Sequence, residues 1–310
     1  TALDAITTGD KNVAVGQDAL TSNTTGTQNT ASGWRSLYLN TTGDYNTASG
    51  TQSLYANTTG VNNTASGYES MYSNTTGTKN TAYGNESLNA NTTGDFNTAT
   101  GYQALCANTT GTRNIAIGIS ALDAADAEND NLAIGYGALG GAIDGGEGNV
   151  AIGNYTLDAL TSGDANTAIG YNSLTANTTG NYNTAVGNEA LKGNTTGVDN
   201  TAIGDGSLKL NTTGGYNTAI GRISLNQNTE GQFNTAIGYN ALLFNTTGTS
   251  NTAIGLNALS YNTTASFNTV VGLGALYDAN RTADANAYNT AIGYKAGDTG
   301  TNDITTGQYN

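Results

Sequence analysis

The sequence of 310 residues contains no proline, no histidine and a single cysteine, Cys106. Without histidine, neither a histidine-containing zinc site nor a Ser-His-Asp triad can be assembled. One cysteine cannot form an intrachain disulfide, so it says little about redox compartment. We therefore expect no cofactor, and we do not expect an enzyme.

Positive charge is also scarce: nine Lys plus Arg stand against 23 Asp plus Glu, for a formal net charge of −14. The basic residues are scattered singly, so we expect neither nucleic acid nor an anionic membrane surface as a partner. No apolar run approaches the ~18 residues that span a bilayer, so membrane insertion is not expected. No signal peptide is visible, and any targeting segment is expected to lie outside this sequence.

Repetition is what the sequence has in abundance. Words of the type NTAIG recur along the whole chain, and their closing glycines are 17 residues apart fourteen times, 18 once and 21 once. We predict one repeat array over residues 1–310, with irregular turns at 123–148 and 277–288. Asparagine stands four residues before each closing glycine, and we predict that these residues stack as a ladder: Asn12, Asn29, Asn46, Asn63, Asn80, Asn97, Asn114, Asn131, Asn149, Asn166, Asn183, Asn200, Asn217, Asn234, Asn251, Asn268 and Asn289.

A period of 17 residues is too short for a pair of helices, and NTAIG alternates with the period of a strand. A second word, NTTG, supplies a turn. We predict an all-β parallel solenoid or β-roll of about 17–18 coils, each with two short strands. Leucine stands four residues after most closing glycines, and we predict that it forms the core: Leu20, Leu37, Leu54, Leu88, Leu105, Leu122, Leu139, Leu157, Leu174, Leu191, Leu208, Leu225, Leu242, Leu259 and Leu276.

The residue before the closing glycine is usually Ile or Val. If the neighbouring Ala and Gly line the interior, this position points outward as an apolar stripe, which soluble monomers avoid. The alternative is that the stripe is core. The pattern leaves the two open. The stripe is a candidate self-association surface, and its central members are Ile117, Ile134, Ile152, Ile169, Val186, Ile203, Ile220, Ile237 and Ile254.

Words such as Asn251-Thr252-Ala253-Ile254-Gly255 and Asn149-Val150-Ala151-Ile152-Gly153 resemble the head repeats of YadA-like trimeric autotransporter adhesins. The resemblance implies a left-handed β-roll with three chains side by side, and it favours the outward stripe as a self-association surface over the core alternative. The period of 17 is longer than in the best-known heads, NTTG adds a polar turn, and no neck, stalk or anchor is seen. Similar arrays also look like parts of phage tail fibres.

Three other surface features each have two interpretations. Ranks such as Thr30-Ala31-Ser32 resemble ice-binding solenoids, although Thr is also an ordinary strand residue. Aromatic rows before the ladder asparagine and after the closing glycine fit either sugar binding or stacking between coils. NTTG is an N-glycosylation sequon, but glycans on consecutive coils would collide, so a turn-forming asparagine ladder is the preferred interpretation.

An acidic segment, residues 123–147, breaks the NTTG pattern, and its carboxylates suggest Ca²⁺ as a cofactor or else a solvated loop. We predict an extracellular, cell-surface structural protein: an adhesin head or shaft, or a filament subunit, associating laterally or end to end. A phage tail fibre shaft and an ice-binding solenoid are the alternatives. The expected partners are copies of the chain itself and host-surface glycans or proteins.

Overall fold

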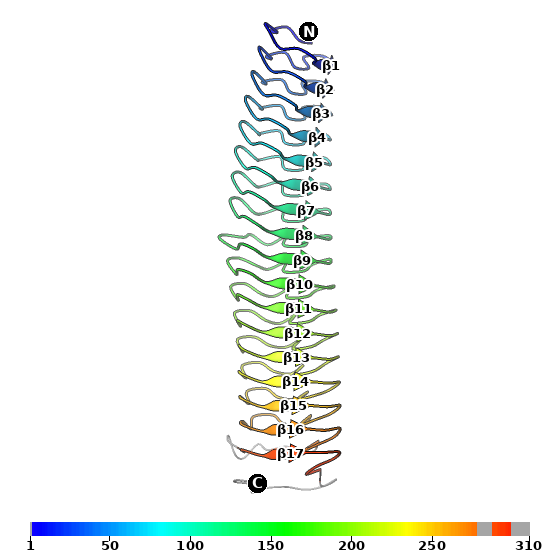
Figure 1. Ribbon diagram of the computed structural model, residues 1–310, viewed down its shortest axis with the longest axis vertical. Coiled ribbons are helices and arrows are strands. Elements are labelled where there is room, and N and C mark those ends of the chain that lie inside the picture. The colour runs from blue at the N-terminus through cyan, green and yellow to red at the C-terminus, as the bar shows by residue number, and fades with distance from the viewer. Residues whose placement is uncertain (1, 278–286, 299–310) are drawn as a thin grey trace. The chain divides into compact units, whose positions relative to one another are not determined.

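A computed structural model describes residues 2–277 and 287–298 of the chain. These residues fall in two compact units, Thr1–Asn154 and Tyr155–Asn310. In each unit the coils follow one another in sequence order, and each coil contributes one strand to a parallel sheet (Figure 1). The described residues form no helix, and hence none that is long and apolar enough to cross a bilayer. The predicted all-β solenoid with a 17-residue coil is confirmed.

Every strand has three residues. In the first unit the strands are β1 (Val13–Val15), β2 (Thr30–Ser32), β3 (Thr47–Ser49), β4 (Thr64–Ser66), β5 (Thr81–Tyr83), β6 (Thr98–Thr100), β7 (Ile115–Ile117), β8 (Leu132–Ile134) and β9 (Val150–Ile152). In the second they are β10 (Thr167–Ile169), β11 (Thr184–Val186), β12 (Thr201–Ile203), β13 (Thr218–Ile220), β14 (Thr235–Ile237), β15 (Thr252–Ile254), β16 (Thr269–Val271) and β17 (Thr290–Ile292).

Neighbouring strands pair in register, so that like residues meet. Ala31 pairs with Ala48, and Ala202 pairs with Ala219, each 17 residues further along the chain. Where the sequence inserts one residue, Leu132 pairs with Val150, so the strands keep their register and the connection absorbs the insertion. Because the period of the sequence repeat matches the register of the strands, a given position of the repeat has the same surroundings in each coil.

The second strand predicted for each coil is not present among the described residues, and that prediction was wrong. The leucine segment forms a column of turns instead. Leu20 has φ of 54° and Asp18 has φ of 57°, which is a left-handed backbone and not an extended one. The turns still bond from coil to coil: the Leu20 amide donates to the Ser36 carbonyl at 3.0 Å.

The core is a thin layer between the strands and these turns. The central alanines of the strands, such as Ala31 and Ala202, and the predicted leucines are almost all without exposed surface. Met71, which replaces leucine in one coil, is buried as completely. Alanine keeps the sheet close to the leucine column, since a larger side chain would force the two apart. Residues 278–286, which hold most of the irregular turn predicted at 277–288, lie outside the described residues.

The closing glycines have a specific structural role. Gly221 has φ of +127°, a conformation that other residues rarely adopt. A Cβ atom at this position would lie 2.7 Å from the carbonyl oxygen of Gly238 in the next coil. The backbone of successive coils can therefore approach at this corner only if glycine recurs there.

Candidate interaction surfaces

The predicted ladder asparagines lie inside the coils: Asn12 is half-buried, and the others have at most 7 % of their surface exposed. They connect coils through the backbone as well as through one another. Oδ1 of Asn12 accepts the amide N–H of Asn29 at 2.9 Å, and Nδ2 of Asn29 donates to the Gly43 carbonyl at 2.8 Å. In the second unit Nδ2 of Asn200 also donates to Oδ1 of Asn183 at 3.1 Å. Each residue thus satisfies backbone groups that the turns leave free.

The asparagines of NTTG form a second kind of column, a chain of side-chain amides that runs from Asn23 to Asn108 in the first unit and from Asn177 to Asn262 in the second. Asn40 Nδ2 donates to Asn23 Oδ1 at 2.8 Å, and Asn57 repeats the contact with Asn40 at 2.7 Å. Each of these Nδ2 atoms also donates to the glycine carbonyl of its own turn. The NTTG asparagines from Asn23 to Asn245 have no exposed surface. Their Nδ2 atoms are therefore closed to glycan attachment in the folded coil.

The apolar stripe lies on the outer face of the sheet. Each of its members follows a buried alanine, so the side chain points away from the core. Ile117, Ile169, Ile203 and Ile220 are 37–40 % exposed. Ile134, Ile152, Val186, Ile237 and Ile254 are half-buried. Neighbouring members pair directly, as Ile203 does with Ile220, so the stripe is continuous within the second unit.

In the first unit the outer face changes character along the chain. Strands β2 to β4 each read TAS, and they present a threonine and a serine outward. Strands β7 to β9 read IAI, LAI and VAI, and every outward residue is apolar. One unit therefore offers a hydroxyl surface on some strands and an apolar surface on others. No described strand carries a charged residue, although the net charge of the chain is −14.

Aromatic side chains form two kinds of column. In the first kind, rings in consecutive coils stack on one another: Tyr38, Tyr55 and Tyr72 lie at centroid distances of 5.2 and 4.9 Å. Tyr216 and Phe233, both before ladder asparagines, stack at 5.0 Å. These distances lie within the range of favourable aromatic pairs, so the rings add stability between coils.

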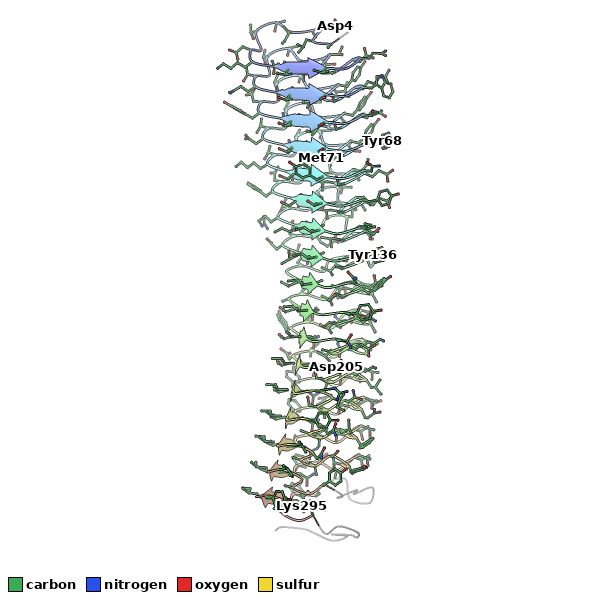
Figure 2. The ribbon with its side chains drawn as sticks, turned by 90° about the vertical axis from the view of Figure 1, so that its right-hand side faces the viewer. Asp4, Tyr68, Met71, Tyr136, Asp205 and Lys295 are labelled. Atoms are coloured by element: carbon green, nitrogen blue, oxygen red, sulfur yellow. The ribbon has the colours of Figure 1, made fainter. Side chains whose placement is uncertain are left out.

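In the second kind of column, rings follow the closing glycine in every second coil of the first unit. Its members are Trp34, Tyr68, Tyr102 and Tyr136, and they are 40–48 % exposed. Tyr68 and Tyr136 extend from the same side of the first unit (Figure 2). The hydrogen bond and the charge of Glu69 raise the pKa of the Tyr68 hydroxyl, so this phenol stays neutral. In the sequence this 34-residue recurrence shows as an aromatic residue after every second closing glycine, a signal that the predicted rows did not include.

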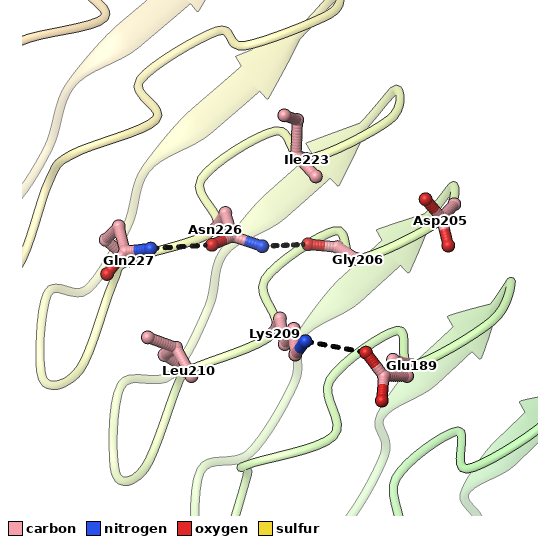
Figure 3. A pocket seen from close by; sticks show the side chains of 8 residues that line it. All are labelled: Glu189, Asp205, Gly206, Lys209, Leu210, Ile223, Asn226 and Gln227. Atoms are coloured by element: carbon pink, nitrogen blue, oxygen red, sulfur yellow. Dashed lines mark hydrogen bonds and ion pairs between the residues drawn. The ribbon is translucent and has the colours of Figure 1, made fainter.

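A small pocket of about 210 Å³ lies in the second unit (Figure 3). It forms where Gly206, with φ of 62°, replaces the side chains that Glu189 and Ile223 carry in the neighbouring coils. Lys209 pairs with Glu189 at 2.6 Å, and Asn226 Nδ2 donates to the Gly206 carbonyl at 2.6 Å. Several of its polar groups thus bond to one another. Sequence reasoning missed the pocket, since three coils contribute to it.

The carboxylates of the acidic turns form hydrogen bonds and ion pairs with other groups of the same chain. Glu128 is buried, and its Oε2 accepts the amides of Asp126 and Ala127 at 2.8 and 3.0 Å. Asp130 pairs with Arg113 at 2.6 Å, which lowers the pKa of the Asp130 carboxyl. Among the described residues, no three His, Cys, Asp or Glu side chains are grouped so as to hold a metal ion. Calcium binding there stays a prediction.

No protein-family model matches the chain, and no curated protein matches it either.

Proposed function

We propose that the chain is a structural protein of the cell surface that assembles with copies of itself through the outer face of its sheet. The single observation that carries this proposal is that the described strands carry no charge, and those from β7 to β17 each present an outward Ile or Val, while the chain as a whole is strongly acidic. Net charge of one sign opposes self-association. Here the strands carry none of that charge, so two copies can bring these faces together without placing like charges in contact.

The repeat also favours a second copy as the occupant. Side chains recur along the stripe at the strand spacing of about 4.8 Å. Another copy has the same spacing by construction, so contacts that form at one coil recur at the next. A contiguous exposed apolar patch of this kind is typical of an interface. This proposal covers an adhesin head or shaft, a surface filament and a phage tail fibre shaft, and the resemblance to YadA-like heads supports a trimer.

The test is the mass of the assembly in solution, measured by light scattering over a range of concentrations. We expect a multiple of the 31.4 kDa chain mass for the wild type. Ile203→Asp should reduce it to the single chain. Leu210→Asp is the matched control, because Leu210 is also 40 % exposed but lies outside the strands. A single-chain mass for the wild type at every concentration would overturn the proposal.

A second candidate function, ice binding, is favoured by one observation. The outward residues of β2 and β3 are all hydroxylated, and Thr30, Ser32, Thr47 and Ser49 are exposed. Regular hydroxyl ranks of this kind resemble ice-binding solenoids. Thermal hysteresis is the measurement that separates the two functions: a freezing-point gap that disappears in Thr47→Lys would favour ice binding, and no gap in the wild type would remove it.

A further inference from the structure

The column of Trp34, Tyr68, Tyr102 and Tyr136 differs physically from the other aromatic columns. Its members are separated by two coils, which corresponds to about 9.6 Å at the strand spacing. Aromatic pairs attract when their centroids are 4.5–7 Å apart. Rings two coils apart therefore cannot stack on one another, whereas Tyr55 and Tyr72, in consecutive coils, stack at 4.9 Å. Stacking among its own members does not account for this column.

The backbone holds the column at a fixed spacing. The carbonyl of Tyr68 accepts the amide of Glu86 at 2.9 Å, and the carbonyl of Tyr102 accepts the amide of Ser120 at 3.0 Å. In the intervening coil the carbonyl of Asn85 accepts the amide of Gln103 at 3.0 Å. The residue that carries each ring is therefore held by a backbone hydrogen bond to the next coil. Such preorganised spacing reduces the entropy that a ligand must overcome.

Polar side chains accompany the rings. Thr51, Asn85 and Ile119 occupy the three coils between them, so two of the three gaps are polar. Beside the rings runs a second column that includes Glu69, Glu86 and Gln103, and Gln103 Nε2 donates to Glu86 Oε2 at 2.7 Å. The surface therefore combines evenly spaced apolar rings with carboxylate and amide groups. Ligand sites generally consist of apolar surface with a few such polar groups.

We infer that this column binds an extended β-1,4-linked polysaccharide. In such a polymer each sugar is turned over relative to its neighbour, so the same C–H face recurs at every second sugar. That recurrence is close in length to two coils. Rings contact the apolar faces of alternate sugars, and the carboxylate and amide groups bond to the hydroxyls. Trp34 lies at one end, where the Arg35 guanidinium carbon is 4.6 Å from the ring centroid, so the three tyrosines form the main contact surface.

The test is depletion of the chain from solution by insoluble polysaccharide. Amorphous cellulose and colloidal chitin are the β-1,4-linked probes, and they separate a glucan from its acetylamino counterpart. Granular starch, which is α-linked and coiled, is the control. We expect depletion by at least one of the first two and not by starch. Tyr68→Ala and Tyr102→Ala should each lower the association constant roughly two- to tenfold, as for the loss of one aromatic contact.

Two further variants distinguish specific binding at this column from nonspecific adsorption. Tyr45→Ala removes a ring in the same unit that is 54 % exposed but outside the column, and it should bind as the wild type does. Asn85→Tyr adds a ring in the gap, so that rings at 68, 85 and 102 can stack on one another, and it should bind more weakly. Thermal melts monitor folding of each variant.

Three results would overturn the inference: no depletion by either β-linked polysaccharide, equal loss of binding in Tyr45→Ala, or tighter binding in Asn85→Tyr. The outcome is independent of the proposed self-assembly, which is measured as mass without polysaccharide. An assembly that binds neither probe would remove this inference and leave the proposed function standing.

Discussion

Asn91 donates a hydrogen bond of 2.7 Å from Nδ2 to Oδ1 of Asn74. Asn108 makes the same contact with Asn91 at 2.9 Å. The column then ends, because the equivalent residue of the next coil is Ala125, and Oδ1 of Asn108 has no hydrogen-bond partner. In the first unit the column therefore has one unsatisfied acceptor, and it lies at the last member.

This arrangement predicts different costs for the same substitution at two places. Asn74→Ala leaves Oδ1 of Asn57 without its donor, which creates a new buried unsatisfied acceptor. Asn108→Ala likewise leaves Oδ1 of Asn91 without its donor, but it also removes Oδ1 of Asn108, which was already unsatisfied. We expect Asn74→Ala to be more destabilising than Asn108→Ala by about 1–3 kcal/mol. Amide hydrogen exchange of the flanking coils measures the difference, and equal losses would show that the amide chain contributes little.

Leu191 lies in the leucine column with no exposed surface. Leu191→Ala should destabilise its coil by about 2–5 kcal/mol, through lost burial and the cavity left behind. Leu191→Met should cost less than about 1.5 kcal/mol, since Met71 occupies the same position in another coil. Urea unfolding followed by circular dichroism compares the variants. If Leu191→Ala unfolds at the wild-type urea concentration, leucine is not the core.

Gln52 has φ of 55°, a left-handed conformation that costs most residues energy. Glycine takes the same place at Gly137, Gly206 and Gly274, with φ of 57–62°. We expect Gln52→Gly to be more stable than Gln52→Ala by about 1 kcal/mol, because both remove the side chain and only alanine keeps the strain. Thermal melts of the two variants give the comparison, and a more stable alanine variant would contradict the assigned backbone.

Glu189 accepts ion pairs from Lys192 and Lys209, both at 2.6 Å. The hydrogen bonds from Lys192 and then Lys209 lower the pKa of the Glu189 carboxyl. A carboxyl whose pKa is lowered on folding stabilises the fold above its unfolded pKa, and this contribution disappears as the pH falls through the lowered pKa. Stability should therefore be steady from neutral pH to about 5 and decrease below about 4. Glu189→Gln should weaken this acid dependence, measured by melts across pH, and salt should reduce the difference.

The period and the composition of the repeat were enough to predict the solenoid and the buried leucines. In-register stacking gives a repeat position the same surroundings in each coil, so recurrence of Leu at one position and Ala at another identifies interior sites. For the isoleucine stripe the pattern left an inward and an outward orientation open, and the resemblance to adhesin heads favoured the outward one.

The backbone of the leucine segment could not be predicted in the same way. Leucine has no local preference for positive φ, and Leu191 adopts φ of 51° within a hydrogen-bonded column of turns. Local propensity therefore pointed to a second strand, and the tertiary arrangement gave a turn. The pocket beside Gly206 was hidden for a related reason, since its walls come from residues in several coils.

In-register pairing also bears on how such a gene changes. Residue 31 meets residue 48, and residue 48 meets residue 65, with the same partner types each time. Deleting or duplicating a stretch of 17 codons within such a run joins two coils that already fit. Slippage between the repeats of the gene can thus alter the number of coils in a single event, and the product keeps every interior contact of its neighbours. Length in this architecture is a trait that can vary between close relatives while the fold stays the same.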